Sequence, residues 1–280
     1  MAASTLQLRL ATAAVLVPLV VAAVLWLPTP AMALLFAVPL LLAAAEWYRM
    51  VGQPDCGGER LLWYGLIGGG LLLGWLAAAG GPLLWAMLGV ALLWWGAVLH
   101  WLRRFPEASG QWYGHPWQRL VAGLLTLVPP FAALLYLHAA PAYGPLWLLY
   151  LLVLVWSADS AAYFAGRRWG RHKLAPRVSP GKTREGLYGA LVACGLFALL
   201  AALWLVDGWL GRLAFLLLSL LVVAISVAGD LLASMVKRQS GHKDSGHLLP
   251  GHGGLLDRID SLTAAAPLFV AGLWLLERVA

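Results

Sequence analysis

Long apolar stretches alternate with short polar segments along the whole chain. Nine of these stretches approach the length of roughly 18–20 residues that crosses about 30 Å of hydrocarbon as a helix. In lipid the backbone amides must bond within the segment, which favours helices, and the alternating pattern of a membrane β-barrel is absent. The predicted spans are 10–27, 31–48, 61–79, 82–101, 120–138, 145–166, 186–206, 212–231 and 261–278. The sequence therefore predicts an all-α integral membrane protein, a polytopic bundle of about nine transmembrane helices.

The first span also has features of a signal peptide, because Ala31-Met32-Ala33 resembles a cleavage site. The apolar run before it is about 18 residues long, whereas signal peptides carry roughly 7–15. A second span follows at once. We therefore expect the first span to be retained.

The composition agrees with a membrane protein. Hydrophobic residues make up 62% of the chain and charged residues 11%, whereas a soluble domain carries about 25% charged residues.

Basic residues are distributed unevenly between the two sides that the nine spans define. All but two of the 19 Lys and Arg residues fall on the side of the N-terminus, the exceptions being Arg212 and Arg278. Basic loops mark the cytoplasmic side, so we expect a cytoplasmic N-terminus and an external C-terminus. The net charge of +7 suits an anionic lipid surface, and no nucleic-acid partner is inferred from it.

The chain divides into two regions. Residues 1–150 hold about five spans, and no charge inside a span stands out there. Their loop 103–118 is typical of a segment lying on lipid headgroups. Residues 151–280 hold the remaining spans and two longer cytoplasmic loops, 167–185 and 232–260. We predict that the second region is catalytic.

Two acids end apolar runs of this second region, Asp159 and Asp230. A charge in hydrocarbon costs about 2.5–3.5 kcal/mol, so such residues usually face a polar cavity. A single acid of this kind is equally well explained as the first residue outside the membrane. Two at the same side favour a shared site, and Tyr163 lies on the helix face of Asp159.

Further polar residues follow at helical spacing. Asp230, Ser234 and Lys237 share one face, and Asp257 and Asp260 are three residues apart at the start of the last span. Carboxylates from two helix ends, Asp230, Asp257 and Asp260, suit Mg²⁺, which prefers oxygen ligands. The alternative is an ion pair between one of the last two acids and a basic residue such as Lys237.

The segment from Ser179 to Gly186 precedes the seventh span and contains Gly-Lys-Thr. A P-loop would need a glycine at Pro176 and a preceding strand, so that interpretation is rejected. A basic and hydroxyl-rich loop leading into a helix N-terminus suits phosphate. The alternative is an ordinary basic cytoplasmic loop.

The second loop is rich in glycine, which lets the backbone approach a ligand closely. Its positive charges are Lys237, Arg238 and Lys243. Histidines recur every five residues at His242, His247 and His252. That spacing matches no helical zinc pair and no cysteine accompanies it, which argues against a zinc site.

From Ser234 to Asp260 the chain reads S-x-apolar-K-R, four residues, K-D, and later P-x-H-G-G-apolar-x-D-R-apolar-D. This pattern resembles the phosphatidate cytidylyltransferase family closely. A second similar segment, Asp159 to Gly186, departs from the family at Gly181 and Arg184.

The resemblance implies that CTP and phosphatidic acid react to give CDP-diacylglycerol and pyrophosphate, with Mg²⁺ and room for a second metal ion. It also implies a homodimer in membrane lipids, in the inner membrane of a bacterium, with its active site facing the cytoplasm. The implied metal ligands are Asp230, Asp257 and Asp260. The implied catalytic set is Asp230, Lys237, Lys243, Asp244, His252, Asp257 and Asp260. The implied substrate contacts are Asp159, Tyr163, Ser179, Lys182, Thr183, Arg184, Glu185, Ser234, Arg238, Gly253, Gly254 and Arg258.

Two other functions are weighed against this one. A CTP-dependent polyprenol or phytol kinase would share a lipid pocket and a metal–nucleotide site, but the pattern from Ser234 to Asp260 argues against it. An ion-coupled transporter would place its acids near the membrane midplane, whereas Asp159 and Asp230 are predicted at cytoplasmic helix ends.

Overall fold

The computed structural model describes residues 5–51, 57–107, 113–140, 144–242, 244–246 and 254–279. Within these ranges the chain forms helices and one pair of short strands. They are α1 (Thr5–Trp26), α2 (Thr29–Val51), α3 (Gly57–Ala77), α4 (Pro82–Arg103), α6 (Pro116–Ala139), α7 (Gly144–Trp169), β1 (Lys173–Ala175), β2 (Ser179–Thr183), α8 (Arg184–Leu205), α9 (Trp209–Gln239) and α10 (Leu256–Val279).

Over the described residues, 8 helices are long and apolar enough to cross a membrane, namely α2 to α4 and α6 to α10. The predicted polytopic all-α fold is confirmed. The first predicted span lies in α1, which contributes the shorter apolar helix Leu16–Trp26. A full crossing by this first span stays a prediction.

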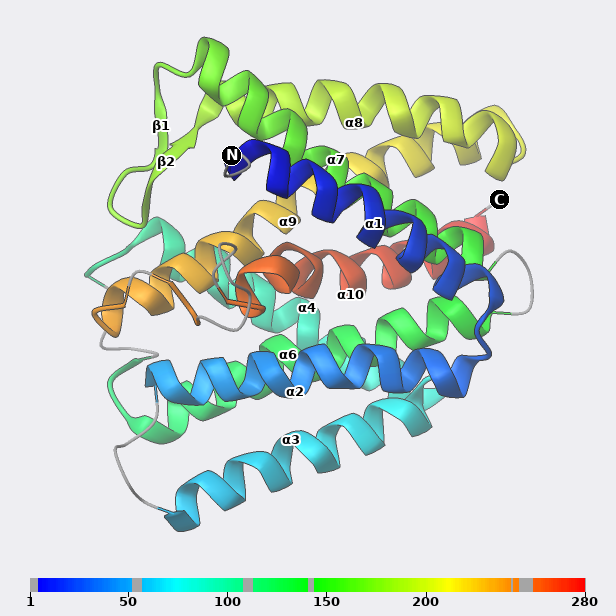
Figure 1. Cartoon of the computed structure of the whole chain (residues 1–280). Helices are drawn as coiled ribbons and strands as arrows, with labels where there is room; N and C mark the ends of the chain where they lie inside the picture. Colours follow the sequence, from blue (N-terminus) through cyan, green and yellow to red (C-terminus); the bar gives the residue numbers. More distant parts are fainter. Residues whose placement is uncertain are drawn as a thin grey trace.

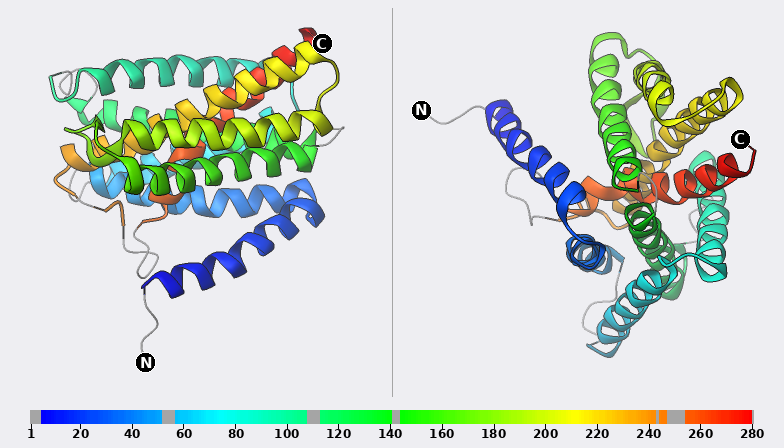
Figure 2. Two further views of the ribbon diagram at one scale, coloured as in Figure 1. Left: turned by 90° about the horizontal axis from the view of Figure 1, so that it is seen from above. Right: turned by 90° about the vertical axis from the view of Figure 1, so that its right-hand side faces the viewer.

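The helices lie side by side along one direction, and the two chain ends are at opposite ends of the bundle (Figure 1). The strand pair and the end of α9 lie at the same end of the bundle. Figure 2 shows the N-terminal half of α1 diverging from the other helices. The fold therefore has one end where long connections gather and another where turns are short.

Helix α6 occupies the centre of the bundle. In its most apolar stretch 72% of the residues are buried, against 28% in α3 and in α8. Gly123 of α6 allows the close approach of two indoles, Trp47 and Trp63. Their N–H groups donate to the carbonyl oxygens of Arg119 and Ala44, at 2.9 and 3.0 Å. These two hydrogen bonds offset the cost of burying the two indole N–H groups.

Helices α9 and α10 pack closely at Gly229. A side chain there would collide with the carbonyl oxygen of Asp260. The absence of a side chain brings the backbone of Asp230 beside the start of α10. Helix α9 also runs two turns past its predicted end, to Gln239, so part of the predicted loop 232–260 is helical.

The predicted loop 167–185 contains an antiparallel hairpin. Its register pairs Lys173 with Thr183 and Ala175 with Ser179. The Thr183 hydroxyl accepts from the backbone N–H of Gly186 at 3.1 Å and so caps α8. This cap fixes the hairpin to the helix that follows it.

Candidate active site

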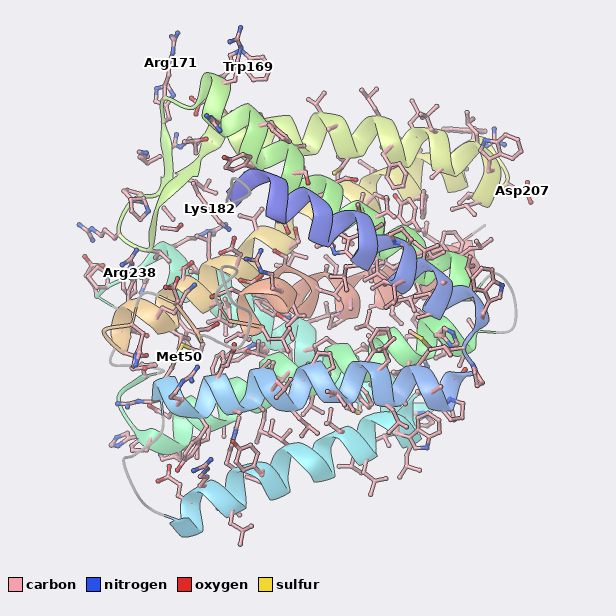
Figure 3. The ribbon with its side chains drawn as sticks, viewed as in Figure 1. Met50, Trp169, Arg171, Lys182, Asp207 and Arg238 are labelled. Carbon is pink, nitrogen blue, oxygen red and sulfur yellow. The ribbon has the colours of Figure 1, made fainter. Side chains whose placement is uncertain are left out.

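The end of the bundle that carries the hairpin also carries most of the predicted site residues. Lys182, Arg238 and Met50 lie at this end, whereas Asp207 lies at the opposite end (Figure 3). The elements that meet here are α2, α7, the hairpin, α9 and α10.

Three acids from three helices form the first cluster, which we call the acid cluster: Asp159 of α7, Asp230 of α9 and Asp260 of α10. Lys182 of β2 joins them, with its Nζ 2.6 Å from Oδ2 of Asp230. The Ser261 hydroxyl donates to Asp159 at 3.4 Å, and the backbone N–H of Ser261 donates to Asp260 at 2.7 Å.

The charged groups of the acid cluster act on one another electrostatically. Asp260 is buried, with 7% of its surface exposed, and it experiences the negative charges of Asp230 and Asp159 and the opposing charge of Lys182. Like charges close to a buried carboxylate disfavour its ionised form. The cluster therefore favours a bound positive charge, and the Lys182 ammonium supplies one.

Asp257 belongs to a second group. Its Oδ1 lies 2.6 Å from Nζ of Lys237, and its Oδ2 accepts from the backbone N–H of Ser245 at 3.2 Å. The ion pair that the sequence offers as the alternative to a metal ligand is thus present. Lys237 does not join Asp230, although the two share a helix face.

The described acids fit magnesium by their chemistry. No three Asp, Glu, His or Cys side chains of the described residues are grouped so that they could hold one ion. Magnesium, however, is commonly bound through one or two carboxylates together with substrate phosphates and waters. Asp230 and Asp260 supply such oxygen ligands at one place, with Asp159 beside them. The complete triad with Asp257 stays a prediction.

Three further predicted residues form hydrogen bonds with neighbouring groups of the protein. The Ser234 hydroxyl donates to Asp230 at 3.3 Å. Glu185 accepts from the backbone N–H of Arg171 at 3.1 Å and lies 2.6 Å from Nδ1 of His172. Thr183 caps α8. These three side chains organise the site and the hairpin.

Several other predicted residues are exposed, namely Tyr163, Arg184, Arg238, Asp244 and Arg258. Tyr163 accepts from Arg167 at 3.3 Å, and Arg238 donates to the carbonyl oxygen of Val178 at 3.3 Å. Ser179 begins β2 and is half-buried. Lys243, His252 and Gly253 lie outside the described residues.

Glu46 of α2 is a site residue that the sequence did not indicate. It is 1% exposed, and its carboxylate accepts from the backbone N–H groups of Leu255 and Leu256 at 2.9 and 2.8 Å. It also accepts from the Ser245 hydroxyl at 3.0 Å. Glu46 thereby caps the N-terminus of α10 from outside that helix.

Neighbours of Glu46 complete this contact. Arg49, one turn further along α2, donates to the carbonyl oxygen of Ser245 at 2.7 Å. A side chain at Gly254 would meet Oε2 of Glu46, and one at Gly246 would meet its Oε1. The glycines of this loop thus let the backbone close around a carboxylate of the protein. The one feature of the sequence that could have pointed to Glu46 is an acid at the end of an apolar run, followed three residues later by an arginine.

This protein is therefore a polytopic helical membrane protein with paired acids and lysines gathered at one end of its bundle. Residues 7–276 match the cytidylyltransferase family, and the chain belongs to that family. It is 44% identical over 269 residues to a phosphatidate cytidylyltransferase of Pseudomonas aeruginosa, covering 96% of this chain and 97% of that protein. It is also 46% identical over 187 residues to a phosphatidate cytidylyltransferase of Haemophilus influenzae, covering 64% and 65% of the two chains.

We predict that Glu46→Ala loosens the start of α10. Each buried donor left unpaired costs about 1–3 kcal/mol, and 1.4 kcal/mol is about a tenfold change in an equilibrium. Amide hydrogen exchange at Leu255 and Leu256 should therefore accelerate by about tenfold or more. The matched control is Glu277→Ala, which removes an exposed acid from the far end of α10. Unchanged exchange in Glu46→Ala would contradict the capping role.

Proposed function

We propose that this protein transfers a cytidylyl group from CTP to phosphatidic acid, forming CDP-diacylglycerol and pyrophosphate. The observation that carries the proposal is the identity to a phosphatidate cytidylyltransferase, 44% over 96% of the chain. The gathering of lysines and acids at one end of a membrane bundle supports it. The match over the whole chain removes the support for a lipid kinase or a transporter.

In this reaction an oxygen of the phosphatidate phosphate attacks the α-phosphorus of CTP. The new O–P bond forms as the bond between the α-phosphorus and its bridging oxygen breaks, and pyrophosphate leaves with the electron pair. Phosphoryl-type transfer depends mainly on positioning and charge neutralisation. Lys182 and Lys237 are the described cations nearest to the acids, and we assign them to the substrate phosphates.

We further propose that Asp230 and Asp260 hold magnesium, with Asp257 released from Lys237 as a third ligand when the substrates are bound. A bound magnesium ion would neutralise phosphate charge and stabilise the leaving pyrophosphate. Ser234 orients Asp230, and the backbone N–H of Ser261 orients Asp260. A second metal ion and a homodimer stay predictions.

The reaction should be measurable with purified protein, CTP, magnesium and phosphatidic acid in mixed micelles. We expect CDP-diacylglycerol and pyrophosphate in equal amounts, loss of turnover with EDTA and recovery with added Mg²⁺. Excess pyrophosphate should drive the products back to CTP. Release of CDP or orthophosphate instead would indicate a kinase or a hydrolase and would exclude the proposal.

Replacement of the acids tests the site. Asp230→Ala and Asp260→Ala should each lower kcat by about 100-fold or more, because a lost metal ligand removes several kcal/mol of transition-state stabilisation. Asp257→Ala should have the same effect if it becomes a ligand. Asp207→Ala, at the other end of the bundle, serves as the control and should be nearly silent. Wild-type turnover in Asp257→Ala alone would leave only Asp230 and Asp260 as ligands.

The chain is a multi-pass membrane protein, and we propose that its active site faces the cytoplasm. The uneven distribution of its 19 basic residues supports this orientation. A reporter that is active only outside the cytoplasm should work when fused after residue 280 and fail when inserted at Arg177. An active reporter at Arg177 would reverse the orientation.

A further inference from the structure

A groove of about 590 Å³ opens between the end of α4, the hairpin, the start of α8 and the middle of α9. Its wall is mostly apolar, with Leu99 and Leu102 from α4, Leu187 from α8 and Val227 from α9. The volume lies in the range of roughly 300–1,000 Å³ that small-molecule sites occupy. The helices that form the groove expose apolar side chains, such as Leu93 of α4, Leu196 of α8 and Leu221 of α9, so lipid chains can reach it.

Two arginines also line the groove, Arg103 at the end of α4 and Arg177 in the turn of the hairpin. Among the described residues Arg103 makes no ion pair. Nη1 of Arg177 lies 2.6 Å from Oε1 of Glu107, and both side chains are about two-thirds exposed, at 64% and 67%. Exposed pairs of this kind contribute little to stability, so Arg177 can exchange Glu107 for a phosphate at small cost.

The groove and the acid cluster share one turn of α9. Ala228 and Leu231 line the groove, and Asp230 lies between them in the sequence, with its carboxylate on Lys182 of the hairpin. The opposite wall includes Val178, whose carbonyl oxygen accepts from Arg238. A molecule in the groove therefore contacts the same backbone turn that presents Asp230.

We propose that this groove binds the phosphatidic acid substrate, with its glycerol and upper acyl chains on the apolar wall and its phosphate at Arg103 and Arg177. The inference rests on the proposed function and adds the place of the lipid. A phosphomonoester carries more negative charge than the phosphodiester of a bulk lipid, and two arginines match it. CTP suits the groove poorly, because its base and ribose would leave polar groups against leucines and alanines.

Steady-state kinetics distinguish binding of phosphatidic acid in the groove from binding of CTP. The double variant Arg103→Ala, Arg177→Ala should raise the KM for phosphatidic acid in mixed micelles by about tenfold or more, since a charged hydrogen bond contributes about 1.5–3 kcal/mol. The KM for CTP should change less than about twofold. The control is Arg104→Ala, an exposed neighbour of Arg103 that does not line the groove.

A second pair of variants tests the apolar wall. Ala224→Trp fills the groove from α9 and should also raise the KM for phosphatidic acid alone. Ala193→Trp places the same ring on an exposed position of α8 outside the groove and should be silent. A rise in the KM for CTP would assign the groove to the nucleotide and overturn the proposal. A change from dimer to monomer in Ala224→Trp, with unchanged KM values, would assign it to a second copy of the chain.

Photo-crosslinking gives a measurement that does not depend on variants. Wild-type protein with phosphatidic acid carrying a diazirine near the top of one acyl chain should be labelled within residues 99–103 and 224–231. Unlabelled phosphatidic acid should compete, and phosphatidylglycerol should not. Labelling spread over all exposed helices, or equal competition, would indicate bulk lipid only. Wild-type protein that does not form CDP-diacylglycerol would instead exclude the proposed function. Failure of the lipid site and failure of the proposed function therefore give different results.

Discussion

Compensation of buried and partly buried carboxylates is the constraint on which this structure depends. An unpaired charge in a low-dielectric interior is too costly to keep. Glu46 is compensated by backbone N–H groups, Asp230 by Lys182 and Asp257 by Lys237. Each pairing fixes a different segment, so the positions of the connecting loop, the hairpin and the end of α9 all follow from where the acids lie.

This constraint joins the two regions of the chain. Glu46 and Arg49 come from α2, and they bind the loop around Ser245 and the start of α10. The loop thus closes on a helix almost 200 residues earlier in the sequence. The N-terminal region therefore contributes to the site, because its helix α2 holds the loop around Ser245 and the start of α10 in place.

The spans could be predicted because their length and apolarity are local properties of the sequence. The hairpin could not, since its strands hold three and five residues and are fixed mainly by Glu185 and the Thr183 cap. Glu46 was missed because its partners are backbone groups distant in sequence. The pairing of Lys237 with Asp257 was foreseen only as an alternative, because helical spacing also places Lys237 on the helix face of Asp230.

One proposed substrate comes from the membrane and the other from water, and α9 presents a different face to each. Toward the groove it presents Ala224, Val227, Ala228 and Leu231, an apolar row at helical spacing. On another face it presents Asp230, with Ser234 one turn further. A helix that ended at residue 231, where the sequence predicts the span to end, would carry the apolar row and Asp230 but neither Ser234 nor Lys237. Because α9 continues to Gln239, the same rigid element places a lipid-facing wall and a charged face a fixed distance apart, and a reaction between a membrane lipid and a soluble nucleotide requires that arrangement.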